Sequence, residues 1–221
     1  MFFNYLEEIR TIKTNPVKRI KQLHNTRTPK EFISDSEFNN LLRYMDSSKL
    51  HEYRDYVIII CLLDTGMRIG ECLMLTTEDI DFKNRSILLK AENTKGRKDR
   101  YVFYSQKLNQ ELKRWLEYKD RYLESEYIFP TNRGGALSVG NFETNFKKYA
   151  KRVKLDNAHP HQIRNNFAKR CIMSGMDIWT LSKILGHSSV TVTEKAYLDL
   201  TNDDIRKNYQ KFSPLENLIR S

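Results

Sequence analysis

The eight residues from Tyr56 to Leu63 form the longest apolar run of the chain, and they constrain its fold more than any other segment. A segment that is apolar on every side has no face for water, so it predicts a helix buried inside a core. Gly66 follows closely, and glycine commonly ends helices in the left-handed conformation. The run is well under half of a membrane span. The sequence therefore predicts a globular domain built around one central helix.

Further helices are predicted by apolar residues that recur at helical spacing. Ser34 and Glu37 have the spacing of a capping box at the start of one helix, and Phe38, Leu41, Leu42 and Met45 form its apolar stripe. Pro160 is well placed to open another, with Ile163, Phe167 and Ile172 toward the core. The other expected helices are Arg68 to Leu75, Leu108 to Leu116, Phe142 to Val153, Met176 to Leu185, Val190 to Tyr197 and Asp203 to Tyr209.

The segment from Asp79 to Tyr104 has a different character. Three short stretches in it are typical of strands, namely Asp79 to Phe82, Ser86 to Leu89 and Arg100 to Tyr104. The polar loop Glu92 to Asp99 joins the last two. The expected fold class is therefore mainly α with a small three-stranded antiparallel sheet (α+β).

A chain of 221 residues suits one ordinary domain with about thirty residues to spare. Residues 1–30 are basic and sparsely apolar, with Pro16 and Pro29, so we interpret them as a linker. Residues 31–221 form the expected domain, with a C-terminal tail from about 203 to 221. The three cysteines, Cys61, Cys72 and Cys171, contain no CxxC pair. Their spacing argues against a disulfide scaffold or zinc site and fits a reducing cytosol.

The positive charge is clustered. The net charge is +10, and three stretches carry half of the 38 lysines and arginines: Arg10 to Lys30, Lys83 to Arg100 and Lys147 to Lys154. Each stretch by itself could be an ordinary solvated face. Three of them together favour a common polyanionic partner with an extended phosphate backbone.

Several short motifs carry chemically apt side chains. Residues 65–71 read Thr-Gly-Met-Arg-Ile-Gly-Glu, where Glu71 lies one turn after Arg68 and can orient its guanidinium toward an anion. His161 and Arg164 are three residues apart and share one helix face. His187 follows a glycine turn, Tyr197 lies ten residues later, and Lys95 lies in the hairpin loop. Each motif alone has an ordinary structural explanation.

Taken together, these motifs resemble the tyrosine recombinase (phage integrase) family. That family has an ordered series: an arginine in a TGxRxxE context, a hairpin lysine, HxxR, a histidine in LGH, and a following tyrosine. This chain has Arg68, Lys95, His161, Arg164, His187 and Tyr197 in that order, between about Thr28 and Asn208. Tyr209 is an alternative nucleophile, although Lys207 and Asn208 fit the motif less well.

The resemblance implies cleavage of a DNA phosphodiester by Tyr197, which forms a 3′-phosphotyrosyl link and releases a 5′-hydroxyl. Arg68 and Arg164 would bind the non-bridging oxygens of the transition state. Lys95 would protonate the leaving oxygen, and His161 would act as general base toward Tyr197. His187 would hydrogen-bond a phosphate oxygen, and Glu71 would orient Arg68. No cofactor or metal is implied.

The resemblance also implies partners. They are double-stranded DNA attachment sites, a homotetramer at synapsis formed from free monomers, and accessory DNA-bending or directionality factors, without a membrane. The expected setting is the bacterial cytoplasm, and the expected use is integration or excision of a mobile element. Residues 1–30 would then be the end of a truncated N-terminal DNA-binding region. The tail from Phe212 to Ile219 could fold on its own domain or dock on a neighbouring subunit.

Phosphate contacts position a protein on DNA without reading its sequence. The basic stretches supply the expected backbone contacts, which are Lys18, Arg19, Lys21, Arg97, Lys98, Arg100, Lys147, Lys148 and Lys151.

Three other functions remain open. A catalytically silent DNA-binding protein of the same fold would form no covalent adduct. A type IB topoisomerase would share the chemistry without synapsis. A metal nuclease could use Asp79, Asp81 and Glu92, although their spacing matches no metal-site signature.

Overall fold

The computed structural model divides the chain into two compact units, Met1–Lys30 and Glu31–Ser221. It describes residues 2–18, 32–94, 98–155, 158–187, 189–197, 200 and 202–212, with the backbone alone at 192, 195–197, 207–208 and 210–212. The first unit contains helix α1, Phe2–Glu8. The linker interpretation did not include this helix, whose segment contains the good helix formers Leu6, Glu7 and Glu8.

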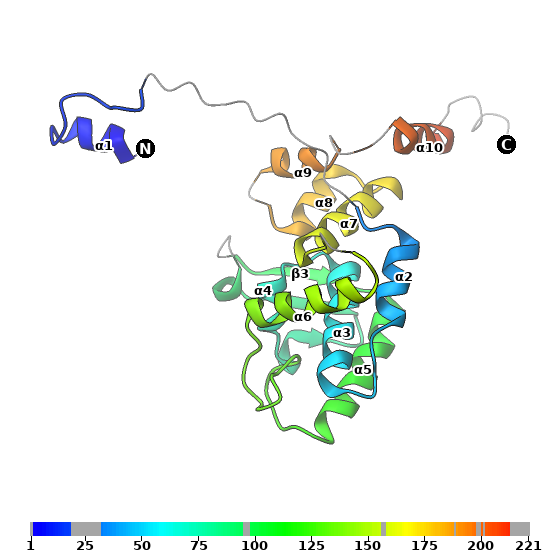
Figure 1. The fold of residues 1–221 in the computed structure, drawn as a ribbon. Helices are drawn as coiled ribbons and strands as arrows, with labels where there is room; N and C mark the ends of the chain where they lie inside the picture. Colours follow the sequence, from blue (N-terminus) through cyan, green and yellow to red (C-terminus); the bar gives the residue numbers. More distant parts are fainter. Residues whose placement is uncertain are drawn as a thin grey trace. The chain divides into compact units, whose positions relative to one another are not determined.

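The second unit is mainly helical (Figure 1). Its helices are α2 (Asp35–Arg43), α3 (Leu50–Thr65), α4 (Ile69–Leu73), α5 (Gln106–Asp120), α6 (Val139–Arg152), α7 (Pro160–Met173), α8 (Ile178–Leu185), α9 (Val190–Tyr197) and α10 (Asn202–Phe212). Local signals set several boundaries. Ser34 and Glu37 form the predicted capping box of α2, and Pro160 is the first residue of α7.

Three short strands form an antiparallel sheet in the order β1-β2-β3. They are β1 (Ile80–Asp81), β2 (Ser86–Leu89) and β3 (Arg100–Phe103), and Ile87 pairs with Val102 across the last two. The predicted fold class, mainly helical with a three-stranded sheet, is confirmed. The predicted strand at Asp79 begins one residue too early. Asp79 instead accepts hydrogen bonds from Thr76 N and Oγ1, which closes a short 3-10 turn at Thr77–Asp79.

Helix α3 supplies the centre of the core. Val57, Ile58, Ile59, Cys61 and Leu62 are all 0–1% exposed, and the helix packs against α5, α6 and α7 (Figure 1). Gly66 ends it with φ of 66°, as predicted. One face of the apolar run differs from the expectation, because Tyr56, Ile60 and Leu63 are only half-buried and line a cavity.

A close approach joins α3 to α7. A Cβ atom added at Gly66 would collide with the ring of Phe167, so glycine is required there for space as well as for φ. Phe167 belongs to a second apolar cluster that also contains Ala168, Ile172, Leu181 and Leu185. This cluster fixes α8 against α7, and the site described below lies where these elements meet. No helix among the described residues is long and apolar enough to cross a membrane.

Candidate active site

Glu71, in the first turn of α4, binds the side chains of two arginines. Its carboxylate accepts from Arg68 N at 2.7 Å and from Arg68 Nη1 at 3.0 Å. Arg100, at the start of β3, donates to both carboxylate oxygens, with Nη1–Oε1 at 3.0 Å and Nη2–Oε2 at 2.6 Å. Burial alone would raise the pKa of Glu71, but these hydrogen bonds and charges outweigh it and the pKa lies below its usual value. Glu71 is therefore an ionised carboxylate between two guanidinium groups.

Arg100 has a protein partner that the sequence-based expectation did not include. We expected its side chain to contact the DNA backbone, and this stays a prediction; in the structure the side chain is 12% exposed and its two Nη atoms both donate to Glu71. The two residues are 29 positions apart, and no local pattern links them. Sequence reasoning therefore missed Arg100 as a partner of the Arg68 and Glu71 pair.

Arg164 lies on α7 and is almost completely buried, with 6% exposure. Its Nη1 donates to Gly66 O at 2.6 Å, and its Nη2 donates to Leu185 O at 2.6 Å and to His187 Nε2 at 3.1 Å. Burial, followed by the neighbouring charge of Arg68, lowers the pKa of Arg164 to about 9. It stays cationic at neutral pH. Described residues use three of its five N–H donors, which leaves two for a ligand.

The last turn of α8 gathers the three arginines. The final carbonyl groups of a helix have no partner within it and carry the negative end of the helix dipole, so they attract cations. The carbonyls of the last two residues and of the C-cap residue Gly186 each accept from a different arginine: Ile184 O from Arg100 Nε at 3.2 Å, Leu185 O from Arg164 Nη2 at 2.6 Å, and Gly186 O from Arg68 Nη2 at 3.5 Å. Three like charges are thereby held close together.

The position before His187 requires a glycine, Gly186, for two reasons. Its φ is 62°, and an added Cβ would lie 2.8 Å from Arg100 Nε. His187 Nδ1 lies 2.8 Å from Thr193 Oγ1. Burial is the largest cause that lowers the pKa of His187 to about 4, and the charges of Arg164, Arg68, Arg100 and His161 add to it. His187 is therefore neutral at physiological pH.

A cavity of about 420 Å³ opens beside these groups. Arg68, Glu71, His161 and Arg164 all line it, so the HxxR pair does face one space. His161 is exposed, and its ring stacks on His159 with centroids 6.4 Å apart. Asn93 and Glu143 also line the cavity, and no motif in the sequence predicts that either belongs to the site. Two cations and an exposed imidazole thus face a space that can hold a phosphate group.

Part of the predicted site lies outside the described residues. This holds for Lys95 and Arg97 in the hairpin loop and for Arg19 and Lys21 near the N-terminus. Thr94 closes the base of the hairpin loop, because its Oγ1 accepts from Lys98 N at 3.2 Å and lies 3.1 Å from Lys98 O. Tyr197 is the last residue of α9, which packs on α7 and α8, and only its backbone is described.

The other predicted backbone contacts lie at the surface. Lys147, Lys148 and Lys151 are exposed on α6, whose opposite side buries Phe142 and Phe146. Lys98 is exposed beside the hairpin loop. Lys18 belongs to the first unit, where its Nζ lies 3.9 Å from Glu7 Oε1.

Two of the three carboxylates considered for a metal site, Asp79 and Asp81, have protein partners. Asp79 Oδ1 lies 2.8 Å from Lys90 Nζ. Asp81 accepts from the backbone N–H groups of Lys83 and Asn84, both at 2.9 Å. Within the described part of the chain, no three His, Cys, Asp or Glu side chains gather closely enough to hold a metal ion.

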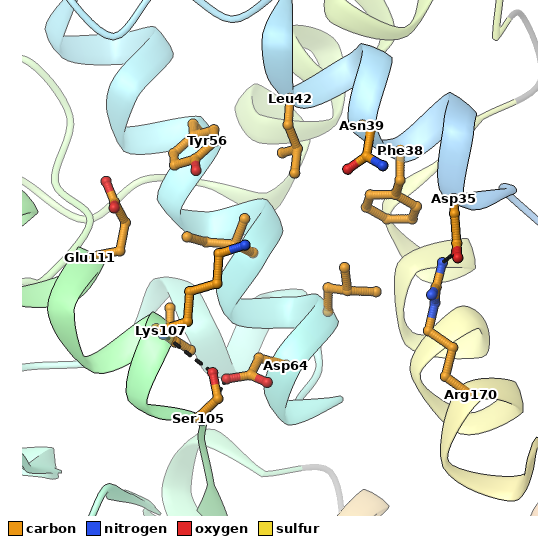
Figure 2. Close-up of a pocket in the computed structure, with 13 residues that line it drawn as sticks. Asp35, Phe38, Asn39, Leu42, Tyr56, Asp64, Ser105, Lys107, Glu111 and Arg170 are labelled. Atoms are coloured by element: carbon orange, nitrogen blue, oxygen red, sulfur yellow. Dashed lines mark hydrogen bonds and ion pairs between the residues drawn. The ribbon is translucent and has the colours of Figure 1, made fainter. Parts of the chain in front are cut away.

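A second cavity, of about 480 Å³, lies among α2, α3, α5 and α7 (Figure 2). Figure 2 shows Phe38, Leu42 and Tyr56 beside it, with an ion pair between Asp35 and Arg170 at one end. Of the predicted catalytic residues whose side chains the structure describes, none lines this cavity.

Comparison with known proteins agrees with the geometry. The model of the phage integrase family matches residues 31–203. Tyrosine recombinase XerC of Oceanobacillus iheyensis is 32% identical over 226 residues, which cover 98% of this chain and 72% of the relative. Tyrosine recombinase XerA of Pyrococcus horikoshii is 30% identical over 205 residues, covering 90% of this chain and 68% of the relative.

Solved structures share the fold. A crystal structure of XerA recombinase superimposes with a TM-score of 0.72 at 26% identity, covering 85% of this chain and 67% of that one. The Tn1549 transposon integrase in complex with transposon right end DNA gives a TM-score of 0.76 at 21% identity, covering 95% and 75%. The match to the family model over most of the chain, together with these relatives, shows that this protein belongs to the phage integrase family, the tyrosine recombinases, which are DNA strand-transferring enzymes.

Proposed function

We propose that this protein is a site-specific DNA recombinase that cleaves and rejoins DNA through a 3′-phosphotyrosyl intermediate at Tyr197. One observation carries the proposal: Arg68 and Arg164 line the same cavity as His161, and α8 and Glu71 hold both guanidinium groups in place. The family membership, and the transposon DNA with which the Tn1549 integrase forms its complex, support DNA as the substrate.

The chemistry follows from the charges in the cavity. Attack on phosphorus gives a pentacoordinate transition state with added negative charge on its non-bridging oxygens. The remaining N–H donors of Arg68 and Arg164 would bind these oxygens, and a preorganised donor of this kind contributes about 3–4 kcal/mol. A phenolic hydroxyl, with a pKa of about 10, is a nucleophile that can also leave again when the strand is rejoined.

The other roles are assigned by residue. His161, exposed at the cavity, is the general base toward Tyr197. Lys95 is the general acid that protonates the leaving 5′-oxygen. Glu71 positions Arg68 and is itself fixed by Arg100. Exposed lysines on α6 would contact the DNA backbone outside the cavity.

The biological use that we propose is integration or excision of a mobile element, carried out by a tetramer at synapsis. The resemblance described for the sequence supports this use. A search for circular junctions of the DNA that flanks the gene, in cells with and without an active protein, tests it directly.

The catalytic proposal is tested with a suicide DNA substrate that carries a nick near its cleavage site. The wild-type protein should form an SDS-resistant protein–DNA adduct, and Tyr197→Phe should form none because it lacks the attacking hydroxyl. Tyr209→Phe is the matched control, since it removes a hydroxyl from the alternative tyrosine.

Each alternative function has its own outcome in this assay. An adduct that forms with Tyr197→Phe and disappears with Tyr209→Phe would move the nucleophile to α10. Cleavage without an adduct, abolished by EDTA, would indicate a metal nuclease. Relaxation of a supercoiled plasmid that carries no recombination site would indicate a topoisomerase, and DNA binding without any adduct would indicate a silent binding protein.

A further inference from the structure

Two polar side chains that line the catalytic cavity have no role in the chemistry proposed above. Asn93 ends the short 3-10 turn Ala91–Asn93, and Glu143 lies in the first half of α6. Within the part of the chain that the structure describes, neither side chain makes a hydrogen bond or an ion pair. Their polar atoms are therefore available to a ligand that occupies the cavity.

Glu143 has the wrong charge to bind a phosphate group. Its side chain is exposed, and an ionised carboxylate accepts hydrogen bonds but donates none. The phosphate that Arg68 and Arg164 would bind is negatively charged, so it repels this carboxylate. A ligand of Glu143 has to supply an N–H donor. On double-stranded DNA the exocyclic amino groups of the bases are such donors, and N4 of cytosine presents one in the major groove.

The exposed face of α6 has an arrangement that suits contact with a base. Glu143, Lys147 and Lys151 follow one another at intervals of four residues, so they share one face of the helix, and all three are exposed. The two lysines are expected contacts of the DNA backbone, and a duplex along this face would bring its base edges to Glu143. One turn earlier, nothing lies within 4 Å of a Cβ added at Gly140, which leaves space beside the carboxylate.

We propose that Glu143 is a specificity-determining residue, which accepts a hydrogen bond from N4 of a cytosine beside the scissile phosphate. The inference rests on the proposed function and deepens it, because it names one base of the attachment site. Adenine also has an amino group, but its neighbouring N7 is an acceptor and would repel the second carboxylate oxygen. Asn93 has both a donor and an acceptor, so it does not select a base by itself.

The test is a selection from a pool of random double-stranded DNA, made with the full chain and followed by sequencing of the bound fraction. The wild-type protein should enrich a site that has cytosine at one position, preferred about tenfold over the other bases. Glu143→Gln should change this preference to adenine, because an amide can donate to N7 and accept from N6. Glu143→Ala should lose the preference at this position and keep those at the others.

Lys147→Gln is the matched control on the same face of α6. It removes an expected backbone contact, so it should weaken binding to all sequences alike and leave the preferred bases unchanged. Unchanged base preferences in both variants of Glu143 would overturn the proposal. Binding that becomes equally stronger to every sequence would also overturn it, because Glu143 would then only repel the backbone.

The selected site, prepared as the nicked suicide substrate, separates this inference from the catalytic proposal. Mapping the adduct should place the cytosine next to the cleaved phosphate, and a distant cytosine would contradict the role of Glu143. A wild-type adduct with the same base preferences in the variants of Glu143 would keep the function and remove that role. Altered base preferences without any adduct would keep the role and contradict the catalytic proposal.

Discussion

The buried carboxylate of Glu71 shows how single residues determine this site. Its side chain is 2% exposed, and it is neutralised by Arg68 from one side and Arg100 from the other. A buried charge is tolerated only when it is paired and hydrogen-bonded. Arg100 supplies two of these hydrogen bonds, so the geometry of Arg68 depends on a residue from the sheet.

Replacement of Arg100 by glutamine should therefore destabilise the protein. Loss of one partner of a buried pair leaves Glu71 with Arg68 alone, and we expect the free energy of unfolding to fall by about 3 kcal/mol in urea titrations. Lys98→Gln is the control, because Lys98 is exposed and belongs to the same hairpin. A variant of Arg100 with unchanged stability and weaker DNA binding would instead support the original expectation of a phosphate contact.

The low pKa of His187, about 4, predicts how stability changes with pH. In the unfolded chain the histidine has its ordinary pKa of about 6.5. Above pH 6.5 His187 is neutral in both the folded and the unfolded state, so its titration does not reduce the free energy of unfolding there. As the pH falls from 6.5 toward 4, the unfolded chain takes up a proton that the folded protein does not, so stability decreases.

This decrease can be measured from urea midpoints between pH 7.5 and pH 5. The midpoint of the wild-type protein should fall more steeply over this interval than that of His187→Gln, which has no titrating ring at this position. Parallel curves for the two proteins would show that His187 has an ordinary pKa in the folded state.

At the level of the elements, the end of α8 is the feature on which the site depends. The carbonyl groups of Ile184, Leu185 and the C-cap residue Gly186 each bind an arginine, and Gly186 turns the chain so that His187 lies beside Arg164. Neither the binding of the arginines nor the turn at Gly186 requires a particular side chain on α8. The backbone itself is the binding group.

Substitution of Gly186 by alanine should disturb this end of the helix. The left-handed φ of 62° costs about 1–2 kcal/mol for a residue with a Cβ, and the Cβ would meet Arg100 at 2.8 Å. We expect a lower melting temperature together with a lower adduct yield. Gly140→Ala is the control, because nothing lies within 4 Å of its Cβ and alanine favours helix α6. Equal melting temperatures for the two variants would contradict this account of Gly186.

Element boundaries could be predicted where one residue dictates the local backbone. Ser34, Gly66 and Pro160 are such residues, and all three predictions are confirmed. The strand expected from Asp79 begins one residue later, because Asp79 uses its carboxylate to cap a turn at Thr76. A side chain that hydrogen-bonds to nearby backbone competes with strand formation, and a pattern of apolar residues cannot predict this competition.

At the level of the whole molecule, four of the predicted site residues lie close together, and several of the contacts that hold them were not predicted. The order of Arg68, His161, Arg164 and His187 was read from motifs, and these residues lie around or beside one cavity. Arg100 and Thr193 were not recognised, because their contacts with Glu71 and His187 depend on how separate elements pack. Arg100 and Glu71 are 29 positions apart, and contacts between separate elements leave no periodic pattern in a single sequence.

Lysines on α6 predict the salt dependence of DNA binding by the whole protein. Lys147, Lys148 and Lys151 are exposed on one helix and each would release about one counterion from DNA. Replacing all three by glutamine should reduce the slope of log K against log salt by about 2–3. The same charge change at Lys107, Lys113 and Arg114 on α5 is the control. Equal slopes in the two triple variants would show that α6 lies away from the duplex.

The carbonyl groups at the end of α8 give the three arginines partners within the protein itself. An incoming phosphodiester would therefore bind through the remaining N–H donors and share cations that already have partners, which limits the net gain in affinity. A cleft of this kind can let its product go as readily as it accepts its substrate. That property suits a reaction in which as many backbone bonds are resealed as are broken, and in which the enzyme must finally leave intact DNA behind.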